Sequence, residues 1–396
     1  MDDQRIRALH VIPSLSLKHG GPSYAVRAMA RSLAIADVDV TIATTDDNGD
    51  NARLKVPIGE PVREDAATLY YFPRNILPYK ISLGLARWLN ANLERFDIVH
   101  IHALFSFSSR AAASAARRHS VPYIVRPLGV LNKWGIENRR AFLKQISLRL
   151  VEIPMLRNAA AIHYTSEAEK LEASRISDEV AVTKSVVIPL PVEIETGNAD
   201  DFRQRFPQTS GRRIILFLSR IDEKKGIELL LDAFANVRRQ VSEAVLVVAG
   251  NGALSYGQKL CQHAKELGIA DAVIWTGHLD GALRSGAFAA ADVFVLPSYS
   301  ENFGVAAAEA LSAGRPTIVT ESVAVSEDIR GYDAGIVVKN DSAELATAIC
   351  RILSQPNLAS RLAANARRLA AERYNINVVG HQLGDLYAAV LKSRRE

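Results

Sequence analysis

Short apolar runs alternate with amphipathic segments along almost the whole chain, and this alternation constrains the fold more than any other feature. In the first half, the apolar runs lie at residues 7–13, 38–45, 96–102, 122–127 and 160–165. Segments with helical periodicity, such as 24–34 and 82–93, separate them. Strands that are apolar on both faces and are joined through helices form parallel sheets covered on both sides. The pattern therefore predicts a doubly wound α/β domain.

The same alternation resumes after a polar segment rich in proline and glycine at residues 189–213. The later apolar runs lie at residues 213–221, 244–250, 272–277, 292–298, 315–320 and 334–339. A chain of 396 residues is also longer than one ordinary core requires. We predict two Rossmann-like parallel-sheet domains facing a central cleft, at residues 1–190 and 191–375. Because ligands of open α/β sheets bind beyond the carboxyl ends of the strands, the active site is expected between the two halves.

Composition indicates a globular protein, with 48% hydrophobic and 23% charged residues. The first apolar run is too short for the core of a signal peptide, and no charge-free apolar run reaches the length of a spanning helix. The two cysteines, Cys261 and Cys350, are isolated and suggest neither a zinc site nor a disulfide framework. We therefore expect a cytoplasmic protein.

Basic side chains are concentrated at residues 110–157, a segment that contains ten basic residues and only two acidic ones. This segment is interpreted either as a solvated face or as a surface for anionic lipid or a phosphorylated acceptor. No recognised motif accompanies the charge, so nucleic acid is not an expected partner. Aromatic and aliphatic side chains interleave with the cations, as in an interfacial helix. The candidate membrane or acceptor surface comprises Lys133, Trp134, Arg139, Arg140, Lys144 and Arg149.

The stretch ENFGVAAAE, residues 301–309, places one glutamate before a predicted helix and another inside it. Glu301 could accept hydrogen bonds from sugar hydroxyls, and Glu309 could hold the vicinal hydroxyls of a ribose. The backbone N–H groups of residues 302–305 lie at the helix start, where they are free to bind a ligand. The alternative is helix capping by acidic residues, which suits Glu301 better than Glu309.

Two further loops contain groups suited to anionic ligands. Arg220 and Lys225 follow a strand and precede a helix, and their charges suit a diphosphate leaving group, although both could be ordinary surface cations. In the first domain, Gly20 and Gly21 precede a helix and permit close approach of a phosphate or acceptor, unless they only form a tight turn.

His100 and His102 lie two residues apart on a predicted strand and share one face. No nearby cysteine, aspartate or glutamate completes a ligand set, so no metal site is predicted. Core packing is one interpretation of the pair. In the other, His102, which is nearer the carboxyl end of the strand, contacts a ligand and helps to fix the reacting geometry.

Together these elements resemble the family 4 glycosyltransferases, which have the GT-B fold and retain anomeric configuration when they transfer a sugar from a nucleotide donor. PSYSENFGVAAAEALSAGRPTIV resembles the E-x7-E signature of that family, and SRIDEKKG resembles its diphosphate motif. The resemblance implies an acceptor-binding domain at 1–190, a nucleotide-sugar domain at 191–375 and a helix at 376–396 that crosses back to the first domain. It also implies that no cofactor and no essential metal is needed.

By the same resemblance, Arg220 and Lys225 bind the diphosphate, Glu301 the transferred sugar, and Glu309 the ribose. The implied catalytic residues are His102, Arg220, Lys225 and Glu301. The implied donor-binding residues are Gly21, Gly277, Leu279, Asn302, Phe303, Gly304, Val305 and Glu309. The sequence departs from the family at residues 320–329, TESVAVSEDI, where relatives often have a glycine-rich turn with Pro-Glu.

The predicted reaction is transfer of a hexose from a UDP- or GDP-sugar to a glycan or lipid-linked acceptor, in bacterial surface polysaccharide or glycolipid synthesis. A peripheral position on the inner face of the plasma membrane would suit a lipid-linked acceptor. Two alternatives are a non-catalytic two-lobed sugar- or nucleotide-binding protein and a two-domain NAD-dependent oxidoreductase. The second is disfavoured because the glycines of AGNGALSYG, residues 249–257, do not have the dinucleotide-binding spacing.

Overall fold

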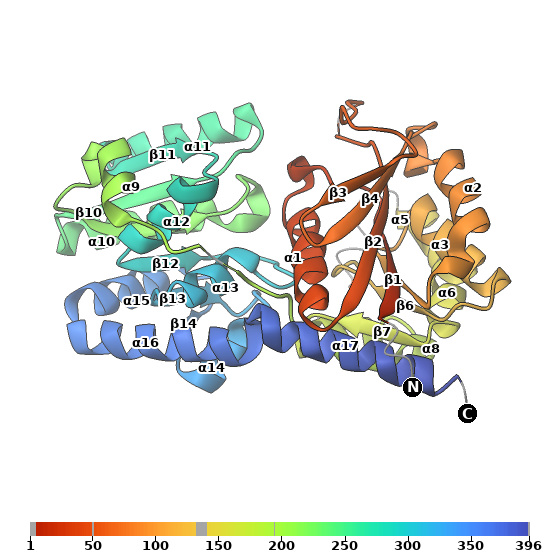
Figure 1. Cartoon of the computed structure of the whole chain (residues 1–396). Helices are drawn as coiled ribbons and strands as arrows, with labels where there is room; N and C mark the ends of the chain where they lie inside the picture. Colours follow the sequence, from red (N-terminus) through yellow and green to blue (C-terminus); the bar gives the residue numbers. More distant parts are fainter. Residues whose placement is uncertain (1–4, 50, 132–140, 194, 395–396) are drawn as a thin grey trace. The chain divides into compact units, whose positions relative to one another are not determined.

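The computed structural model describes residues 5–49, 51–131, 141–193 and 195–394. Contacts divide the chain into two compact units. The N-terminal unit contains Met1–Pro191 and also Ile376–Glu396, and the C-terminal unit contains Val192–Asn375. Each unit has one sheet with helices packed on its faces (Figure 1).

The sheet of the N-terminal unit has the strand order β3-β4-β2-β1-β5-β6-β7-β8. Its neighbouring strands are parallel except for the antiparallel pair β3 and β4 at one edge. That edge hairpin departs from the fully parallel sheet that the sequence pattern predicted. The strands are β1 Ile6–Val11, β2 Val38–Thr45, β3 Pro61–Glu64, β4 Ala67–Phe72, β5 Ile98–His102, β6 Tyr123–Arg126, β7 Ala161–Tyr164 and β8 Ser185–Val187.

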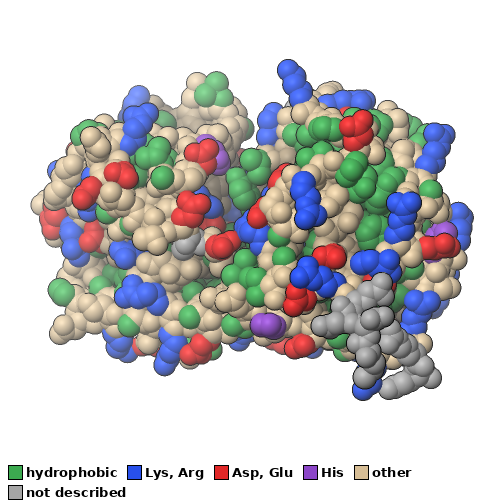
Figure 2. Space-filling view, viewed as in Figure 1, with side chains coloured by type: hydrophobic (Ala, Val, Ile, Leu, Met, Phe, Trp, Pro, Cys, Tyr) green, Lys and Arg blue, Asp and Glu red, His purple; other side chains and the backbone are tan. Residues whose placement is uncertain are grey.

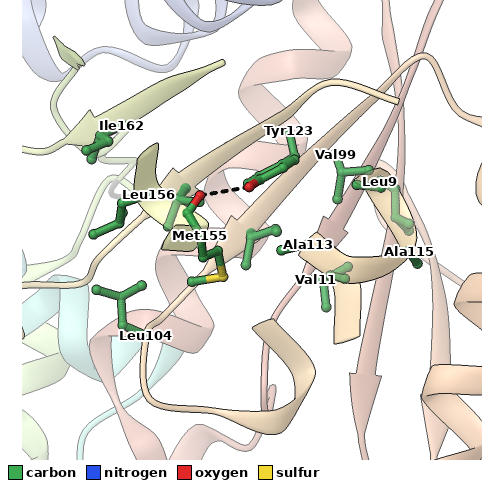
Figure 3. Packing of buried hydrophobic residues seen from close by; sticks show 14 of the residues in the cluster. Leu9, Val11, Val99, Leu104, Ala113, Ala115, Tyr123, Met155, Leu156 and Ile162 are labelled. Atoms are coloured by element: carbon green, nitrogen blue, oxygen red, sulfur yellow. Dashed lines mark hydrogen bonds between the residues drawn. The ribbon is translucent and has the colours of Figure 1, made fainter. Parts of the chain in front are cut away.

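Helices cover both faces of this sheet. They are α1 Gly21–Ile35, α2 Leu83–Asn92, α3 Phe107–Arg118, α5 Ala141–Ser147, α6 Ile153–Arg157, α7 Glu167–Ser174, α8 Asp178–Val182 and α17 Ile376–Lys392. Because side chains alternate along a strand, Leu9 and Val11 of β1 pack with α2 and α3, whereas Ala8 packs with α1 and α17. Figure 3 shows the first of these cores, in which the hydroxyl of buried Tyr123 donates to the carbonyl oxygen of Met155 at 2.7 Å.

The second core joins the two ends of the sequence, because α17 packs on α1. The backbones approach closely where Gly380 meets Ser32. A Cβ atom at Gly380 would lie 2.1 Å from the carbonyl oxygen of Ser32, so a larger residue would force the helices apart. Each fully buried leucine of α1 and α17, such as Leu33 and Leu383, contributes about 1.5–3 kcal/mol by leaving water.

The sheet of the C-terminal unit is parallel throughout, in the order β11-β10-β9-β12-β13-β14. Its strands are β9 Arg213–Leu218, β10 Ala244–Ala249, β11 Val273–Gly277, β12 Val293–Leu296, β13 Thr317–Thr320 and β14 Gly335–Val338. Its helices are α9 Ala199–Arg205, α10 Ile227–Gln240, α11 Leu254–Glu266, α12 Gly281–Ala290, α13 Val305–Ser312, α14 Ser326–Tyr332, α15 Ser342–Ser354 and α16 Pro356–Leu369. Strand β9 lies in the middle of the sheet, so the loops that follow β9 and β12 are neighbours.

Charged side chains are distributed over the surface without forming one large patch on the face that Figure 2 shows, where basic and acidic groups are interspersed. Within the described residues, no helix combines the length and the apolar character needed to cross a membrane.

Candidate active site

The turn between β9 and α10 holds three cations in a compact arrangement. Asp222 accepts a hydrogen bond from the N–H of Lys224 at 3.1 Å and so caps the 3-10 turn Glu223–Lys225. Burial lowers the pKa of Lys224; the carboxylate of Asp222 opposes this shift, and the charges of Lys225 and Arg220 add to it. Arg220 itself is exposed. The predicted diphosphate pair therefore lies beside a third cation, Lys224, which the sequence interpretation had not assigned.

This turn is fixed against the end of β12 by a glycine. Gly226 has φ +65°, and a Cβ atom there would lie only 2.1 Å from the carbonyl oxygen of Pro297. The N–H of Tyr299 also donates to the carbonyl oxygen of Lys224 at 2.8 Å. Any residue other than glycine at position 226 would separate the cationic turn from the loop that contains Glu301.

Lys225 and Glu301 form an ion pair across these two loops. The side chain of Lys225 is 9% exposed and that of Glu301 is 20% exposed, so the pair is partly shielded from water. The structure thus brings together two of the predicted catalytic residues, although they are 76 positions apart in the chain. In a partly buried ion pair, each charged side chain is stabilised by the charge of the other. Removal of one side chain therefore leaves the remaining charge buried and uncompensated.

The loop of Glu301 is braced by the segment in which the sequence departs from the family. The N–H of Glu301 donates to the carbonyl oxygen of Ser322 at 3.0 Å, and the N–H of Ala324 donates to the carbonyl oxygen of Glu301 at 3.2 Å. The N–H of Val325 reaches the carbonyl oxygen of Phe303 at 3.3 Å. These contacts form a short parallel pairing that holds the predicted sugar-binding loop in place.

Helix α13 begins directly after this loop. Gly304 precedes its first residue, Val305, with φ +93°, and a Cβ atom there would lie 2.9 Å from Cγ1 of Val323. Phe303 is buried, with its ring 5.5 Å from that of Tyr374 in an edge-on arrangement, whereas Asn302 is half-buried. The amino end of α13, whose first N–H groups have no partner within the helix, therefore directly follows the loop that contains Glu301.

Glu309 lies inside α13, as the sequence predicted, and its carboxylate forms an ion pair with Arg284 of α12. Burial raises the pKa of Glu309, and the guanidinium of Arg284 opposes that increase. Nothing in the sequence around Arg284 signals this contact, because the two residues meet only through the packing of two helices. The predicted contact of Glu309 with a ribose remains a prediction.

Two further predicted donor residues lie at the carboxyl end of strand β11, which Gly277 ends. Gly277 has φ +71°, and its carbonyl oxygen accepts from the N–H of Gly250 at 2.8 Å, while Leu279 is buried. Gly250 and Gly252 meet the backbone of the β9 loop: a Cβ atom at Gly250 would lie 1.8 Å from the carbonyl oxygen of Ser219. These glycines therefore serve backbone packing between two loops, which explains their irregular spacing.

In the N-terminal unit, the glycine pair opens helix α1. Gly20 has φ +71° and immediately precedes Gly21, the first residue of the helix. The hydroxyl of Ser23 donates to the carbonyl oxygen of Ser16 at 2.8 Å and closes the turn. The tight turn is therefore present, and the predicted contact of Gly21 with a ligand is untested.

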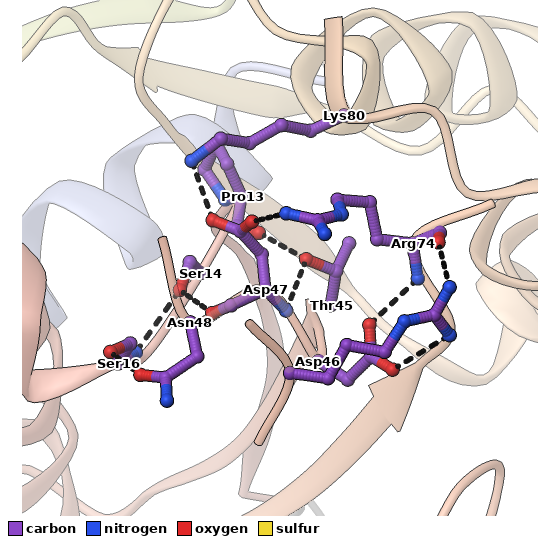
Figure 4. A network of polar contacts seen from close by, with 10 residues as sticks. Pro13, Ser14, Ser16, Thr45, Asp46, Asp47, Asn48, Arg74 and Lys80 are labelled. Atoms are coloured by element: carbon purple, nitrogen blue, oxygen red, sulfur yellow. Dashed lines mark hydrogen bonds and ion pairs between the residues drawn. The ribbon is translucent and has the colours of Figure 1, made fainter. Parts of the chain in front are cut away.

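Close to this turn, a buried polar network ties together the carboxyl ends of β1, β2 and β4 (Figure 4). Fully buried Asp47 pairs with Arg74 and with Lys80, whose Nζ lies 2.6 Å from Asp47 Oδ2. Asp46 accepts from the N–H of Arg74 at 2.7 Å and from Arg53 at 3.4 Å. The sequence interpretation missed these residues, because they are scattered over three loops.

His102 lies in the core of the N-terminal unit. Its ring is fully buried, with Nε2 3.0 Å from Nδ1 of His10 and Nδ1 3.5 Å from Nη1 of Arg126. His10, His100 and His102 can place one nitrogen each within 4.8 Å of one another. Core packing, one of the two interpretations of the sequence, describes the observed environment, and the predicted ligand contact of His102 is untested.

Only two of the six residues of the predicted membrane or acceptor surface lie among the residues that the structure describes. Lys133, Trp134, Arg139 and Arg140 lie outside the described residues. Lys144 is half-buried on α5, and Arg149 is exposed on Leu148–Glu152, the π-helical segment η4. Large apolar side chains share this region and are 41–73% exposed, namely Phe142, Leu143, Ile146 and Leu150.

Comparison with known families identifies the class of this protein. A profile described as "Glycosyl transferase 4-like domain" matches residues 20–191, and one described as "Glycosyl transferases group 1" matches residues 198–369. Together the two profiles account for most of the chain. The protein therefore belongs to this family of glycosyltransferases, as its motifs indicated.

Characterised relatives include three transferases of different specificity. The chain is 32% identical to the phosphatidyl-myo-inositol mannosyltransferase of Mycobacterium leprae over 51% of its own length and 54% of the relative. It is 29% identical to the alpha-D-kanosaminyltransferase of Streptomyces kanamyceticus, over 48% and 49% of the two chains. These matches span about half the length of either relative. The D-inositol 3-phosphate glycosyltransferase of Acidothermus cellulolyticus is 26% identical over 95% of this chain and 87% of that protein.

Solved structures resemble the whole chain. Sucrose-phosphate synthase from Thermosynechococcus elongatus matches with a TM-score of 0.77 at 21% identity, over 98% of this chain and all of that one. Anabaena HepE in complex with UDP-glucose matches with a TM-score of 0.76 at 17% identity, over 97% of this chain and 100% of that one. These similarities confirm the predicted GT-B fold with two Rossmann-like α/β domains.

Proposed function

We propose that this protein is a retaining glycosyltransferase that moves a hexose from a UDP- or GDP-sugar to a glycan or lipid-linked acceptor. The observation that carries the proposal is the ion pair of Lys225 and Glu301 beside Arg220 and the amino end of α13. Clustered cations suit a leaving diphosphate that gains charge, and a neighbouring carboxylate can accept hydrogen bonds from sugar hydroxyls, so this arrangement supports the proposal. The family membership of the chain supports the reaction class.

In the proposed reaction, the donor's diphosphate displaces Glu301 from Lys225 and takes over the ammonium. The bond from the anomeric carbon to the diphosphate oxygen breaks, and the electron pair leaves with the diphosphate. The acceptor hydroxyl attacks the same face and transfers its proton to the departing phosphate oxygen. Arg220, Lys225 and the amino end of α13 then supply the positive potential that a metal ion supplies in other transferases.

A panel of nucleotide sugars tests this proposal. UDP-glucose, UDP-galactose, GDP-mannose and GDP-glucose would each be assayed for release of the nucleotide diphosphate and for an increase in melting temperature. A bound donor must stabilise the folded protein by mass action, by about 2.7 kcal/mol at a concentration 100 times Kd. One donor is expected to do both. If no donor shifts the melting temperature or is consumed, the protein is not a transferase of this kind.

The two rival functions make different predictions in the same experiment. A non-catalytic sugar- or nucleotide-binding protein would be stabilised by a donor without consuming it, even when acceptor glycans are present. An NAD-dependent oxidoreductase would change absorbance at the nicotinamide band. The packing of Gly250 and Gly252 against the β9 loop disfavours the second, because these glycines are occupied by backbone contacts.

We also propose that α5 and η4 dock on an anionic membrane, where a lipid-linked acceptor for surface polysaccharide or glycolipid synthesis would be presented. Phe142, Ile146 and Leu150 recur at helical spacing and are strongly exposed, and Arg149 lies beside them. Apolar side chains flanked by cations are typical of interfacial helices.

Sedimentation with vesicles tests this second proposal. The wild-type protein should bind vesicles containing 30% phosphatidylserine or phosphatidylglycerol, and Phe142→Ser with Leu150→Ser should abolish most of that binding. Leu171→Ser offers a matched control, because Leu171 is 54% exposed on α7, outside the α5–η4 segment. Equal binding to neutral and anionic vesicles would remove the electrostatic part of the proposal, and unchanged binding of the double variant would refute it.

A further inference from the structure

Five polar side chains gather inside the N-terminal unit on the sheet face that α1 and α17 cover. His10, His100, His102, Arg126 and His163 come from four neighbouring strands and are at most 2% exposed. Strand alternation explains their common direction, because their neighbours one position away belong to the opposite core. A sixth group, the hydroxyl of buried Tyr387 on α17, lies among them.

The ring nitrogen that carries the proton can be assigned for each histidine of this cluster, starting from His163. Nε2 of His163 lies 2.8 Å from the carbonyl oxygen of Ile188, which can only accept, so His163 carries its proton on Nε2. Burial lowers the pKa of His163 to about 3, so the ring is neutral and its Nδ1 accepts. That nitrogen lies 3.3 Å from Nε2 of His100, which must donate.

The same reasoning continues through the hydroxyl. Burial lowers the pKa of His100 as well, so its Nδ1 accepts, and the hydroxyl of Tyr387 donates to it at 2.8 Å. The hydroxyl oxygen in turn accepts from Nε2 of His10 at 2.9 Å. Burial lowers the pKa of His10 to about 3, which leaves Nδ1 of His10 as an acceptor.

This series of hydrogen bonds ends at the guanidinium cation of Arg126. Nε2 of His102 lies 3.0 Å from Nδ1 of His10 and donates to it. Nδ1 of His102 then accepts, over 3.5 Å, from Nη1 of Arg126, a group that can only donate. All six groups therefore form one directed chain from Arg126 to the carbonyl oxygen of Ile188, and every histidine in it carries its proton on Nε2.

A metal ion is a poor explanation of the same residues. Each ring nitrogen of His10, His100 and His102 already has a hydrogen-bond partner within the chain. Burial lowers the pKa of Arg126 only to about 10, so a guanidinium cation lies beside His102. A divalent cation would have to break several of these bonds and lie close to that positive charge.

We propose that Tyr387 of α17 is a positioning residue for His102. Through His10, its hydroxyl provides the shorter of the two hydrogen bonds of His102, and this bond, together with the 3.5 Å contact of Arg126 on the other nitrogen, sets which nitrogen carries the proton and keeps the ring in one orientation. This inference rests on the proposed function insofar as His102 serves transfer. A neutral His102 with a fixed tautomer contributes hydrogen bonds of fixed direction, and no formal charge, to the reacting geometry.

Nitrogen-15 NMR of the histidine rings tests the directed chain of hydrogen bonds without any activity assay. In the wild-type protein at pH 7.5, the long-range couplings of all four buried histidines should show the Nε2–H tautomer. Assignment would use His10→Gln and His163→Gln. A ring that carries its proton on Nδ1, or that is doubly protonated, would overturn the directed chain.

Two pairs of variants then test the positioning role, and the assay is release of the nucleoside diphosphate from UDP-glucose or from whichever donor the panel identifies. Tyr387→Phe should lower kcat about tenfold, leave the KM for the donor within about twofold, and give His102 a mixture of tautomers. Tyr123→Phe is the matched control, because Tyr123 is an equally buried tyrosine with one hydrogen bond, to Met155, in the opposite core. It should lose stability but keep the tautomer of His102 and kcat.

The second pair of variants replaces His10, so that the positioning role can still be tested if Tyr387→Phe folds poorly. A glutamine at position 10 can both accept from His102 and donate to Tyr387, so His10→Gln should retain most of kcat, whereas His10→Leu should not. If Tyr387→Phe and His10→Leu both keep kcat within twofold of Tyr123→Phe, the positioning role is refuted. If the wild-type protein releases no nucleoside diphosphate from any donor of the panel, the proposed function fails, but the NMR result still decides whether the directed chain of hydrogen bonds exists.

Discussion

The polar clusters of the two units differ in charge and in exposure. In the C-terminal unit, Lys225 with Glu301 and Arg284 with Glu309 are ion pairs, and each pair has a side chain that is 20% or more exposed. In the N-terminal unit, the cluster around His102 is sealed, and its histidines are neutral. Partly exposed ion pairs can exchange a partner for a charged ligand, whereas a sealed chain of neutral groups can only hold its members in place. The comparison supports the roles proposed above, which are ligand binding for the first cluster and orientation of His102 for the second.

The largest expected effect comes from breaking the first ion pair. Lys225→Ala removes the cation proposed for the diphosphate, so transfer should fall by about 10²–10³-fold while the protein stays folded. Lys265→Ala, which removes an exposed lysine of α11, is the control and should leave transfer unchanged. Initial rates and circular dichroism measure the two properties. Activity within tenfold of wild type in Lys225→Ala would contradict the assignment.

A buried carboxyl in the N-terminal unit gives the next effect, on stability. Burial raises the pKa of Glu152 from an ordinary 4.5 to about 7, although Ser147 donates to it at 3.1 Å. Between these two values the folded protein binds more protons than the unfolded chain. The free energy of unfolding should therefore fall as pH rises from 5 to 8, by up to about 3 kcal/mol from this group.

Urea denaturation at pH 5 and pH 8 measures that loss. Glu152→Gln cannot titrate, so its stability should change less between the two pH values than that of the wild-type protein. An equal loss in both proteins would show that Glu152 is ionised in the folded state throughout this range.

A glycine comparison tests how the cationic turn is held. Gly226→Ala should lower the free energy of unfolding by about 1–3 kcal/mol and weaken donor binding, because φ is +65° and the new Cβ would meet the carbonyl oxygen of Pro297. Gly257→Ala lies in α11 with no atom within 4 Å of a new Cβ, so it should be neutral or stabilising. Thermal unfolding with and without donor distinguishes the two variants, and equal behaviour would refute the packing argument.

The smallest effect is expected when Arg284, the ion-pair partner of Glu309, is removed. Arg284→Ala leaves Glu309 buried without its cation, so the carboxylate is no longer held in place, and the KM for the donor should rise about tenfold. Glu309→Ala removes the group proposed for the ribose itself and should lower transfer by orders of magnitude. If the two variants have equal effects, Arg284 contacts the donor directly instead of positioning Glu309.

The sequence was sufficient to predict the fold class and to place Glu301 before helix α13 and Glu309 inside it. Strand periodicity and the spacing of these two glutamates are local properties of the sequence. Contacts made by packing could not be predicted in this way. Arg284 reaches Glu309 only because two helices cross, and Tyr387 reaches His10 only because α17 covers the first sheet. The sequence placed His102 correctly on a strand, but the burial of its ring depends on helices distant in the chain.

The division of the chain has a consequence for recombination between related transferases. Because residues 376–396 group with the N-terminal unit, a chimera that exchanges the C-terminal unit needs crossover points near both 191 and 375. A single crossover would place a foreign α17 on the native sheet. Gly380 would then have to match the carbonyl of Ser32, and the phenol at 387 would have to match the histidines beneath it. Shuffled libraries with one breakpoint should therefore yield few folded members.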